Sequence, residues 1–168
     1  MRVEVERDDS LNEDSFEREF EDETSECLKD AYDEEALLKL WKYWRERAMN
    51  FLVRREHSEV ELRQKLRQRD CPSWMLDELM QWFYEKKYLS LERFAYSYTK
   101  NRSDLGYGPI RIRYELSGQH QIPALYIDEA FNEIDWDAAR ETAERKIKQT
   151  DEQKYRAALY RRGFMFNE

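Results

Sequence analysis

The side chains best suited to chemistry in this 168-residue sequence are arginines and lysines beside turns and near expected helix ends. A guanidinium forms paired hydrogen bonds with a carboxylate or a phosphate, and an ammonium acts on the same groups as a point charge. The predicted chemistry is therefore reversible binding of anionic groups on a protein or a nucleic acid. The candidate binding residues are Arg54, Arg55, Lys100, Arg102, Tyr107, Arg111, Arg113, Arg161 and Arg162.

The densest of these groups surrounds residues 106–116, which combine a flexible turn with a helix start. Two glycines in the turn allow backbone angles that other residues avoid, and Pro109 suits the first turn of a helix. Arg111 and Arg113 then flank the apolar face of that helix. Tyr107 lies between the two glycines and is expected to be an exposed contact.

Residues 100–102 precede this turn and are expected to join it in one basic patch. The basic candidates also have structural alternatives. Arg111 and Arg113 could lie on a solvated helix face near Glu115. Arg161 and Arg162 occupy the last turn of an expected helix, where cations favour the helix dipole by roughly 0.3–1 kcal/mol. The sequence leaves both interpretations open.

Nothing in the residue pattern predicts catalysis. The sequence has no phosphate-binding loop, zinc signature or nucleophile paired with a base. His57 and His120 have no metal-ligand spacing with any cysteine, so both are expected to be surface or turn histidines. Cys27 and Cys71 are too few for a disulfide framework and are expected to be reduced. We therefore expect no metal site and no cofactor.

Charge divides the chain into an acidic leader and a mildly basic body. Residues 1–36 hold sixteen acidic and four basic residues, a net charge of −12, whereas residues 37–168 carry a net charge of +4. Such a composition favours a flexible leader over residues 1–34. Alternatively, the leader folds over the basic body and lowers its affinity for DNA, with Phe16 and Phe20 packing where a helix is missing.

Membrane insertion and secretion are not predicted. No apolar run approaches the roughly 20 residues that a membrane-spanning helix needs. The first residues also lack the apolar core of a signal peptide. We therefore expect a cytoplasmic protein.

Apolar residues recur at helical spacing through the body, which predicts an all-α fold. Helices are expected to begin after three capping side chains, Ser58, Ser90 and Asp151, and another helix is expected to begin at Asp135. Glu61 completes a capping box with Ser58, and Gly118 and Gly163 are placed as C-terminal stops. The aromatic residues expected in the core are Trp41, Trp44, Tyr98, Trp136 and Tyr155.

The helical pattern repeats along the chain. Residues 112–116 match residues 62–66, and residues 155–159 match them again. This period predicts tandem three-helix repeats in an elongated, curved array. The expected units are a leader over 1–34, an N-terminal helix with the first repeat over 35–89, the second repeat over 90–134, and a third repeat over 135–168 that lacks most of its last helix.

Four segments in order resemble motifs of the RecX family of bacterial RecA regulators. Residues 54–62 are similar to its R-R-x-x-S-x-x-E-L opening, and residues 88–95 to its Y-L-x-D-x-R-F-A link. Residues 108–116 resemble its G-x-x-R-I-x-x-E-L core, and residues 159–164 its closing L-x-R-R-G-F. The resemblance covers roughly residues 45–166.

The resemblance implies a curved array of three-helix repeats without catalytic activity. It further implies binding to the RecA–DNA filament, in the filament groove, and inhibition of ATP hydrolysis, strand exchange and co-protease activity in recombination, DNA repair and the SOS response. The basic candidates would then face RecA or DNA, with weak, sequence-independent DNA binding. We expect the chain to act as a monomer.

Some features depart from the family pattern. Lys87 and Leu91 stand where the family usually has a glycine and an acid. Only four residues follow Phe164, whereas family members continue with another helix, so Phe164 and Phe166 are expected to be exposed. Two alternatives therefore stay open: a helical DNA-binding protein without a RecA partner, and a degenerate family member with an altered role.

Overall fold

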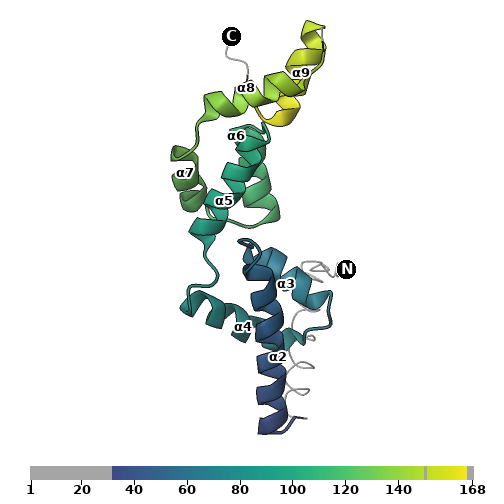
Figure 1. The fold of residues 1–168 in the computed structure, drawn as a ribbon, viewed down its shortest axis with the longest axis vertical. Helices are drawn as coiled ribbons and strands as arrows, with labels where there is room; N and C mark the ends of the chain where they lie inside the picture. Colours follow the sequence, from purple (N-terminus) through teal and green to yellow (C-terminus); the bar gives the residue numbers. More distant parts are fainter. Residues whose placement is uncertain (1–31, 150, 166–168) are drawn as a thin grey trace, which may run out of the picture.

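The computed structural model describes residues 32–149 and 151–165, and all regular secondary structure in these ranges is helical. The all-α prediction is thereby confirmed. Expectations for the leader before residue 32, including Phe16, Phe20 and Cys27, and for Phe166 lie outside the described residues. The elements in Figure 1 are α2 (Glu34–Leu52), α3 (Glu59–Arg67), α4 (Ser73–Glu85), α5 (Leu91–Asp104), α6 (Pro109–Tyr114), the π-helical turn η1 (Glu115–Gln119), α7 (Ala124–Asn132), α8 (Trp136–Lys146) and α9 (Glu152–Arg162).

The predicted helix starts are confirmed. The side chains of Ser58, Ser90, Asp135 and Asp151 each accept a hydrogen bond from the backbone N–H three residues later, at 2.9–3.2 Å. These bonds satisfy N–H groups that have no partner within the helix. The capping box at α3 is only half formed, because Glu61 turns its carboxylate to Arg55, with Nη1 to Oε2 at 2.9 Å.

Gly118 does not end its helix, contrary to the prediction. It lies inside η1, and a Cβ placed on it would meet no atom within 4 Å. The backbone widens after α6, so that Ile122 N–H donates to Leu116 O at 2.9 Å. Gln121, with φ 54°, makes the change of direction instead. Gly163, with φ 93°, ends α9 as predicted.

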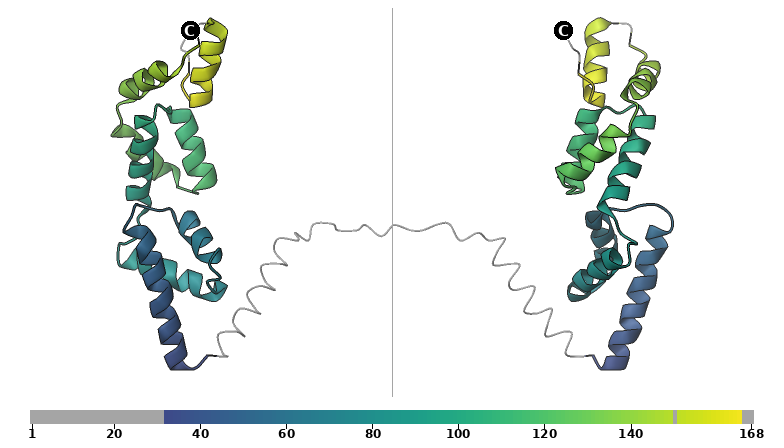
Figure 2. Two further views of the ribbon diagram at one scale, coloured as in Figure 1. Left: turned by 45° about the vertical axis from the view of Figure 1, so that its right-hand side comes forward. Right: turned by 90° about the vertical axis from the view of Figure 1, so that its left-hand side faces the viewer.

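The buried apolar residues form three clusters in a row along the molecule. The first lies among α2, α3 and α4, the second among α5, α6, η1 and α7, and the third between α8 and α9. Figures 1 and 2 show these groups of helices following one another along the long axis. We propose on this basis that residues 35–89, 90–134 and 135–165 belong to three structural units.

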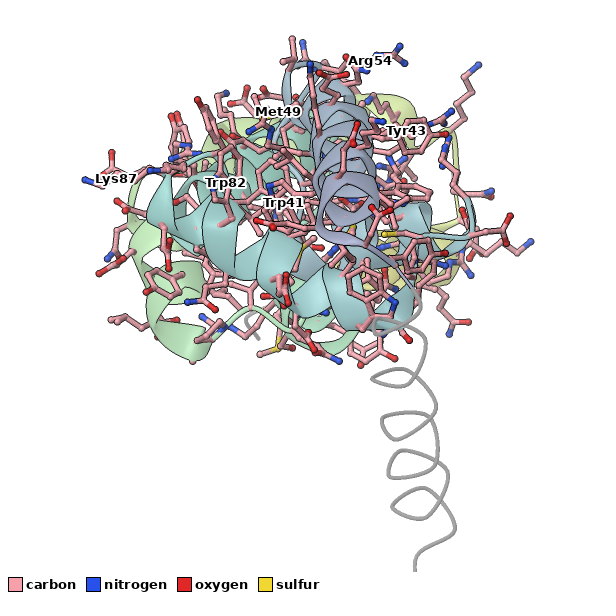
Figure 3. The ribbon with its side chains drawn as sticks, turned by 90° about the horizontal axis from the view of Figure 1, so that it is seen from below. Trp41, Tyr43, Met49, Arg54, Trp82 and Lys87 are labelled. Atoms are coloured by element: carbon pink, nitrogen blue, oxygen red, sulfur yellow. The ribbon has the colours of Figure 1, made fainter. Side chains whose placement is uncertain are left out.

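The aromatic residues expected in the core do pack against these clusters. Trp44 is buried in the first, beside the half-buried Trp41. Tyr98 and Trp136 border the second cluster, and Trp136 and Tyr155 border the third. Trp41 lies between α2 and α4 in the view along the long axis (Figure 3). Helical spacing therefore identified which side of each helix faces a core.

Phe164 is buried, with only 5% of its surface exposed, contrary to the expectation for a truncated third unit. The left-handed turn at Gly163 sends the chain back toward α8, and Phe164 N–H donates to Leu159 O at 3.2 Å. The ring packs with Ala139, Ala143 and Leu159. Two helices and one aromatic side chain thus close the third cluster.

None of the helices in the described ranges is both long enough and apolar enough to cross a membrane.

Candidate functional site

The centre of the candidate site is a buried carboxylate, Glu115, at the point where α6 passes into η1. Arg111, four residues earlier, donates from Nε to Glu115 Oε1 at 2.9 Å. Arg102 of α5 donates from Nε to Oε2 at 2.8 Å and also contacts Oε1 through Nη2, and the Tyr98 hydroxyl donates to Oε2 at 3.1 Å. Burial alone would raise the pKa of Glu115, but the hydrogen bonds from Arg102 and Arg111 outweigh it and lower the pKa.

The ring of Tyr107 lies against three guanidinium groups. The Cζ atoms of Arg102, Arg111 and Arg162 lie 3.9, 4.6 and 5.5 Å from the ring centroid. A cation over an aromatic face is attracted by the ring quadrupole. Tyr107 is half-buried, so the expectation of an exposed contact is wrong: its ring is engaged by arginines of the same chain.

The start of α6 meets the end of α9 through backbone atoms. Gly108 N–H donates to Arg162 O at 2.7 Å, and Ile110 N–H donates to Gly163 O at 3.3 Å. A Cβ on Gly108 would lie 2.6 Å from the Gly163 carbonyl carbon, and a Cβ on Gly163 would lie 2.5 Å from Arg111 N. Only glycine fits at either position while the two helices stay this close.

Two arginines of the candidate set add side-chain hydrogen bonds to this contact between the start of α6 and the end of α9, which we call the joint. Arg111 donates from Nη1 to Arg161 O at 3.1 Å, and Arg162 donates from Nη1 to Gly106 O at 3.2 Å. These bonds satisfy the carbonyl of Arg161 in the last turn of α9, which has no partner within the helix, and the carbonyl of Gly106 in the turn after α5. Arg102, Arg111 and Arg162 therefore have structural contacts within the chain.

The predicted patch joining residues 100–102 to the glycine turn is wrong in part. Positions two apart on a helix face in nearly opposite directions. Arg102 accordingly reaches Glu115, whereas Lys100 donates to Asp104 Oδ1 at 2.6 Å and lines a different pocket, beside Asp135.

Three further candidates lie away from the cluster. Arg113 pairs with Asp128 of α7, with Nη2 to Oδ1 at 2.6 Å, on the other side of α6. Arg55 belongs to the first unit, where it pairs with Glu61. Arg54 is exposed after the end of α2 and projects from the edge of the molecule (Figure 3). The nine candidates therefore do not form one surface.

A cationic groove opens beside the joint, and the sequence analysis found only part of it. Its volume is about 520 Å³, and it lies between α6, the segment after α8, and α9. Its lining residues are Tyr107, Arg111, Lys146, Ile147, Lys148, Gln149, Ala158, Arg161 and Arg162. Lys146 and Lys148 were missed, although the Lys-Ile-Lys run at an expected helix end was the available signal.

Both histidines lie between helices, as expected for turn positions, but both are buried and neither is on the surface. Ser58 Oγ lies 3.0 Å from Nδ1 of His120, which packs against the rings of Phe94 and Tyr98. His57 Nδ1 lies 3.0 Å from its acceptor, Arg55 O. Burial lowers the pKa of both imidazoles. The Ser58–His120 contact joins the first unit to the second, so these histidines have structural roles.

Two observations on the described residues concern metal binding and thiol chemistry. The described ranges contain no group of three or more His, Cys, Asp or Glu side chains placed to hold a metal ion. Cys71 is buried, and burial raises the pKa of its thiol to about 12, which disfavours the reactive thiolate. The arrangement can bind anions.

The fold and the sequence both have known relatives. A crystal structure of a regulatory protein RecX matches with a TM-score of 0.63 and 21% identity, over 80% of this chain and 75% of that chain, which shows a shared fold. The family model for the first three-helix domain of RecX matches residues 45–82.

Curated relatives named "Regulatory protein RecX" match a longer part of the sequence than the family model does. The protein of Pseudomonas entomophila strain L48 is 42% identical over 99 residues, 58% of this chain, and the match spans 63% of that relative, less than two thirds of its length. The protein of Pseudomonas fluorescens strain Pf-5 is 43% identical over 106 residues, 61% of this chain and 68% of the relative. On this identity and coverage, the chain belongs to the RecX family.

Proposed function

We propose that this chain is a non-catalytic regulator that binds the RecA–DNA filament and inhibits ATP hydrolysis, strand exchange and co-protease activity. RecA is the partner that the family resemblance implies, and the curated relatives carry the name of regulatory proteins. Its place of action would be the cytoplasm, during recombination and DNA repair.

The observation that carries this proposal is the single-file arrangement of the three helical clusters (Figure 2). An extended molecule can touch more than one subunit of a polymer, or a subunit and the DNA it holds. Binding that is tighter in one filament state than in another shifts the filament toward that state. A protein without a catalytic group can inhibit ATP turnover in this way.

Arg161 is the candidate contact best suited to a test. Its side chain is exposed and forms no ion pair within the described residues. Arg102 and Arg111, by contrast, pair with Glu115, so changing either would disturb the fold together with any contact. A guanidinium at position 161 can bind an acidic side chain of RecA or a DNA phosphate.

The test is the single-stranded-DNA-dependent ATPase rate of RecA, with this protein added well below the RecA concentration. We expect inhibition by the unmodified chain and weaker inhibition by Arg161→Glu. The matched control is Arg67→Glu, because Arg67 is also an exposed arginine in the last turn of a helix. The control should inhibit like the unmodified chain. Absence of inhibition at equal concentrations would refute the proposal.

The alternative of a sequence-independent DNA-binding protein without a RecA partner draws on the cationic groove. It predicts DNA binding in the absence of RecA, with an affinity that falls steeply as salt rises. It also predicts that the RecA ATPase changes only as far as free DNA is removed. Raising the DNA concentration would then restore the rate, whereas filament inhibition would persist.

A further inference from the structure

The groove between α6, residues 146–149 and α9 has a one-sided charge. Five of its nine lining residues are cations: Arg111, Lys146, Lys148, Arg161 and Arg162. The lining contains no carboxylate. Five like charges around about 520 Å³ repel one another, and a bound polyanion would relieve that repulsion.

Three of these cations already have contacts that explain their positions. Arg111 pairs with Glu115. Arg162 donates to Gly106 O, and Lys146 donates from Nζ to Leu105 O at 3.0 Å. Contacts within the fold therefore account for the positions of these three cations, which add positive charge to the lining of the groove.

The other two cations have no such contact, although Arg161 lies in the last turn of α9, where the helix dipole favours a cation. Neither Lys148 nor Arg161 forms a side-chain hydrogen bond or ion pair with any described residue, and both are exposed. The helix dipole acts only within the last turn, and Lys148 lies beyond Ile147, the C-cap of α8. The two side chains approach the same groove from different segments, which leaves their donors available to a ligand.

We propose that this groove is a phosphate-binding site, with Lys148 and Arg161 as its direct ligands. An arginine fork can bind two phosphate oxygens at once, and a lysine adds a mobile point charge. The phosphate can come from a nucleic-acid backbone or from a free nucleoside polyphosphate. Tyr107 does not offer a stacking face, because guanidinium groups cover its ring, so the site should not distinguish one base from another.

This inference does not require RecA, and its test leaves RecA out. Isothermal titration calorimetry at low ionic strength would measure binding of inorganic triphosphate, ATP and a short oligothymidylate to the full chain. The test variant is Lys148→Ala with Arg161→Ala. The control, Lys42→Ala with Arg67→Ala, removes the same two charges from exposed positions of α2 and α3 in the first unit. Thermal unfolding would verify that both variants fold.

We expect the test variant to lose about 10- to 100-fold in affinity, as fits the loss of two charge-assisted contacts, while the control binds like the unmodified chain. Oligoadenylate should bind like oligothymidylate. Tighter binding of triphosphate and ATP than of the oligonucleotide would identify a nucleoside polyphosphate as the source, and the reverse order would identify a nucleic-acid backbone.

Several results would overturn the proposal. Equal losses in the test and control variants would mean that net charge, and not this groove, drives binding. No binding of either triphosphate or oligonucleotide to the unmodified chain would remove the site altogether. If polyglutamate bound as tightly as triphosphate, the groove would be a site for an acidic protein segment. None of these results depends on whether the chain inhibits RecA.

Discussion

Glu115 is the residue on which the arginine cluster depends. Its carboxylate is 8% exposed and accepts hydrogen bonds from Arg102, Arg111 and Tyr98. Removing one partner of a buried ion pair leaves the other charges without compensation, which commonly costs several kcal/mol. Two cations held close together would then repel each other.

Glu115→Gln is therefore expected to lower the free energy of unfolding by about 3 kcal/mol. Urea denaturation followed by circular dichroism would measure it. The control is Asp128→Asn, which breaks the exposed pair with Arg113 and should change stability by less than about 1 kcal/mol. If both variants changed the free energy of unfolding by similar amounts, the buried ion pairs of Glu115 would stabilise the fold no more than an exposed pair does.

His57 predicts a pH dependence of stability. Its Nε2 lies 2.8 Å from Lys65 Nζ. Burial, together with the charges of Arg55 and Lys65, lowers its pKa and outweighs the opposing hydrogen bond to Arg55 O and the charge of Glu61. The unfolded chain takes up a proton here as the pH falls through about 6.5, while the folded chain does not until lower pH. The unfolded state then binds more protons, so stability is lost as the pH falls. His120 acts in the same direction.

The midpoint of thermal unfolding should consequently be lower at a pH near 5.5 than at a pH near 7.5. His57→Gln should weaken this dependence because it removes one of the two buried imidazoles that titrate in this range. A melting temperature that stays constant or rises on acidification would contradict the assignment of His57 as a buried neutral side chain.

At the scale of the elements, residue 87 shows a mismatch between residue type and backbone. Lys87 follows the end of α4 with φ 57°, a left-handed conformation that suits glycine. The family motif usually has glycine there. In this chain the side chain of Lys87 is exposed and points away from the molecule (Figure 3).

Lys87→Gly should raise the free energy of unfolding by about 1 kcal/mol, because the left-handed conformation no longer strains a side chain. Urea denaturation would measure the gain. Lys86→Gly, one residue earlier with φ −83°, is the control and should not stabilise the chain. A loss of stability in Lys87→Gly would mean that the lysine stem makes a packing contribution larger than the strain.

Helix positions were predictable from the sequence because their signals are local. Ser90 and Asp135 cap the helices that follow them, and apolar spacing identified the buried faces. The π-helical turn around Gly118 was not predictable, because the same residue type ends some helices and is tolerated within others. The burial of Phe164 depends on α8, more than twenty residues away, which no local pattern reveals.

The candidate site was predictable only in residue type. Arg111 and Arg161 were identified as cations near helix ends, and the structure places both at one groove. Which arginines bind Glu115 and which remain available depends on contacts between helices, such as Arg102 of α5 with Glu115 across 13 positions. Residues 146–149 and α6 belong to different units and meet only in the folded chain. The Lys-Ile-Lys run therefore signalled cations near a helix end, but not that Lys148 shares a groove with Arg161.

At the scale of the whole molecule, the units depend on the contacts between their neighbours. The third unit rests on the second through the backbone of Gly108 and Gly163. In a linear stack each unit gains stability only from those next to it. A change at the joint should therefore release one end of the molecule before the rest.

Gly108→Ala is expected to destabilise the chain by about 1–3 kcal/mol, because its Cβ would overlap the Gly163 carbonyl. Limited proteolysis should cut α8 and α9 before α2–α4. Gly118→Ala is the matched control: its Cβ has open space within η1, so it should be neutral or stabilising by up to about 1 kcal/mol. Equal protease resistance of the two variants would contradict a joint at Gly108.

The contact between these glycines also constrains how the sequence can change over time. Where two side chains meet, a larger residue on one side can be offset by a smaller one on the other. Gly108 and Gly163 meet through main-chain atoms, and neither can become smaller. Among related sequences, the joint should therefore be visible as two positions that each stay glycine, and not as a covarying pair. No second substitution at one position should rescue a change at the other.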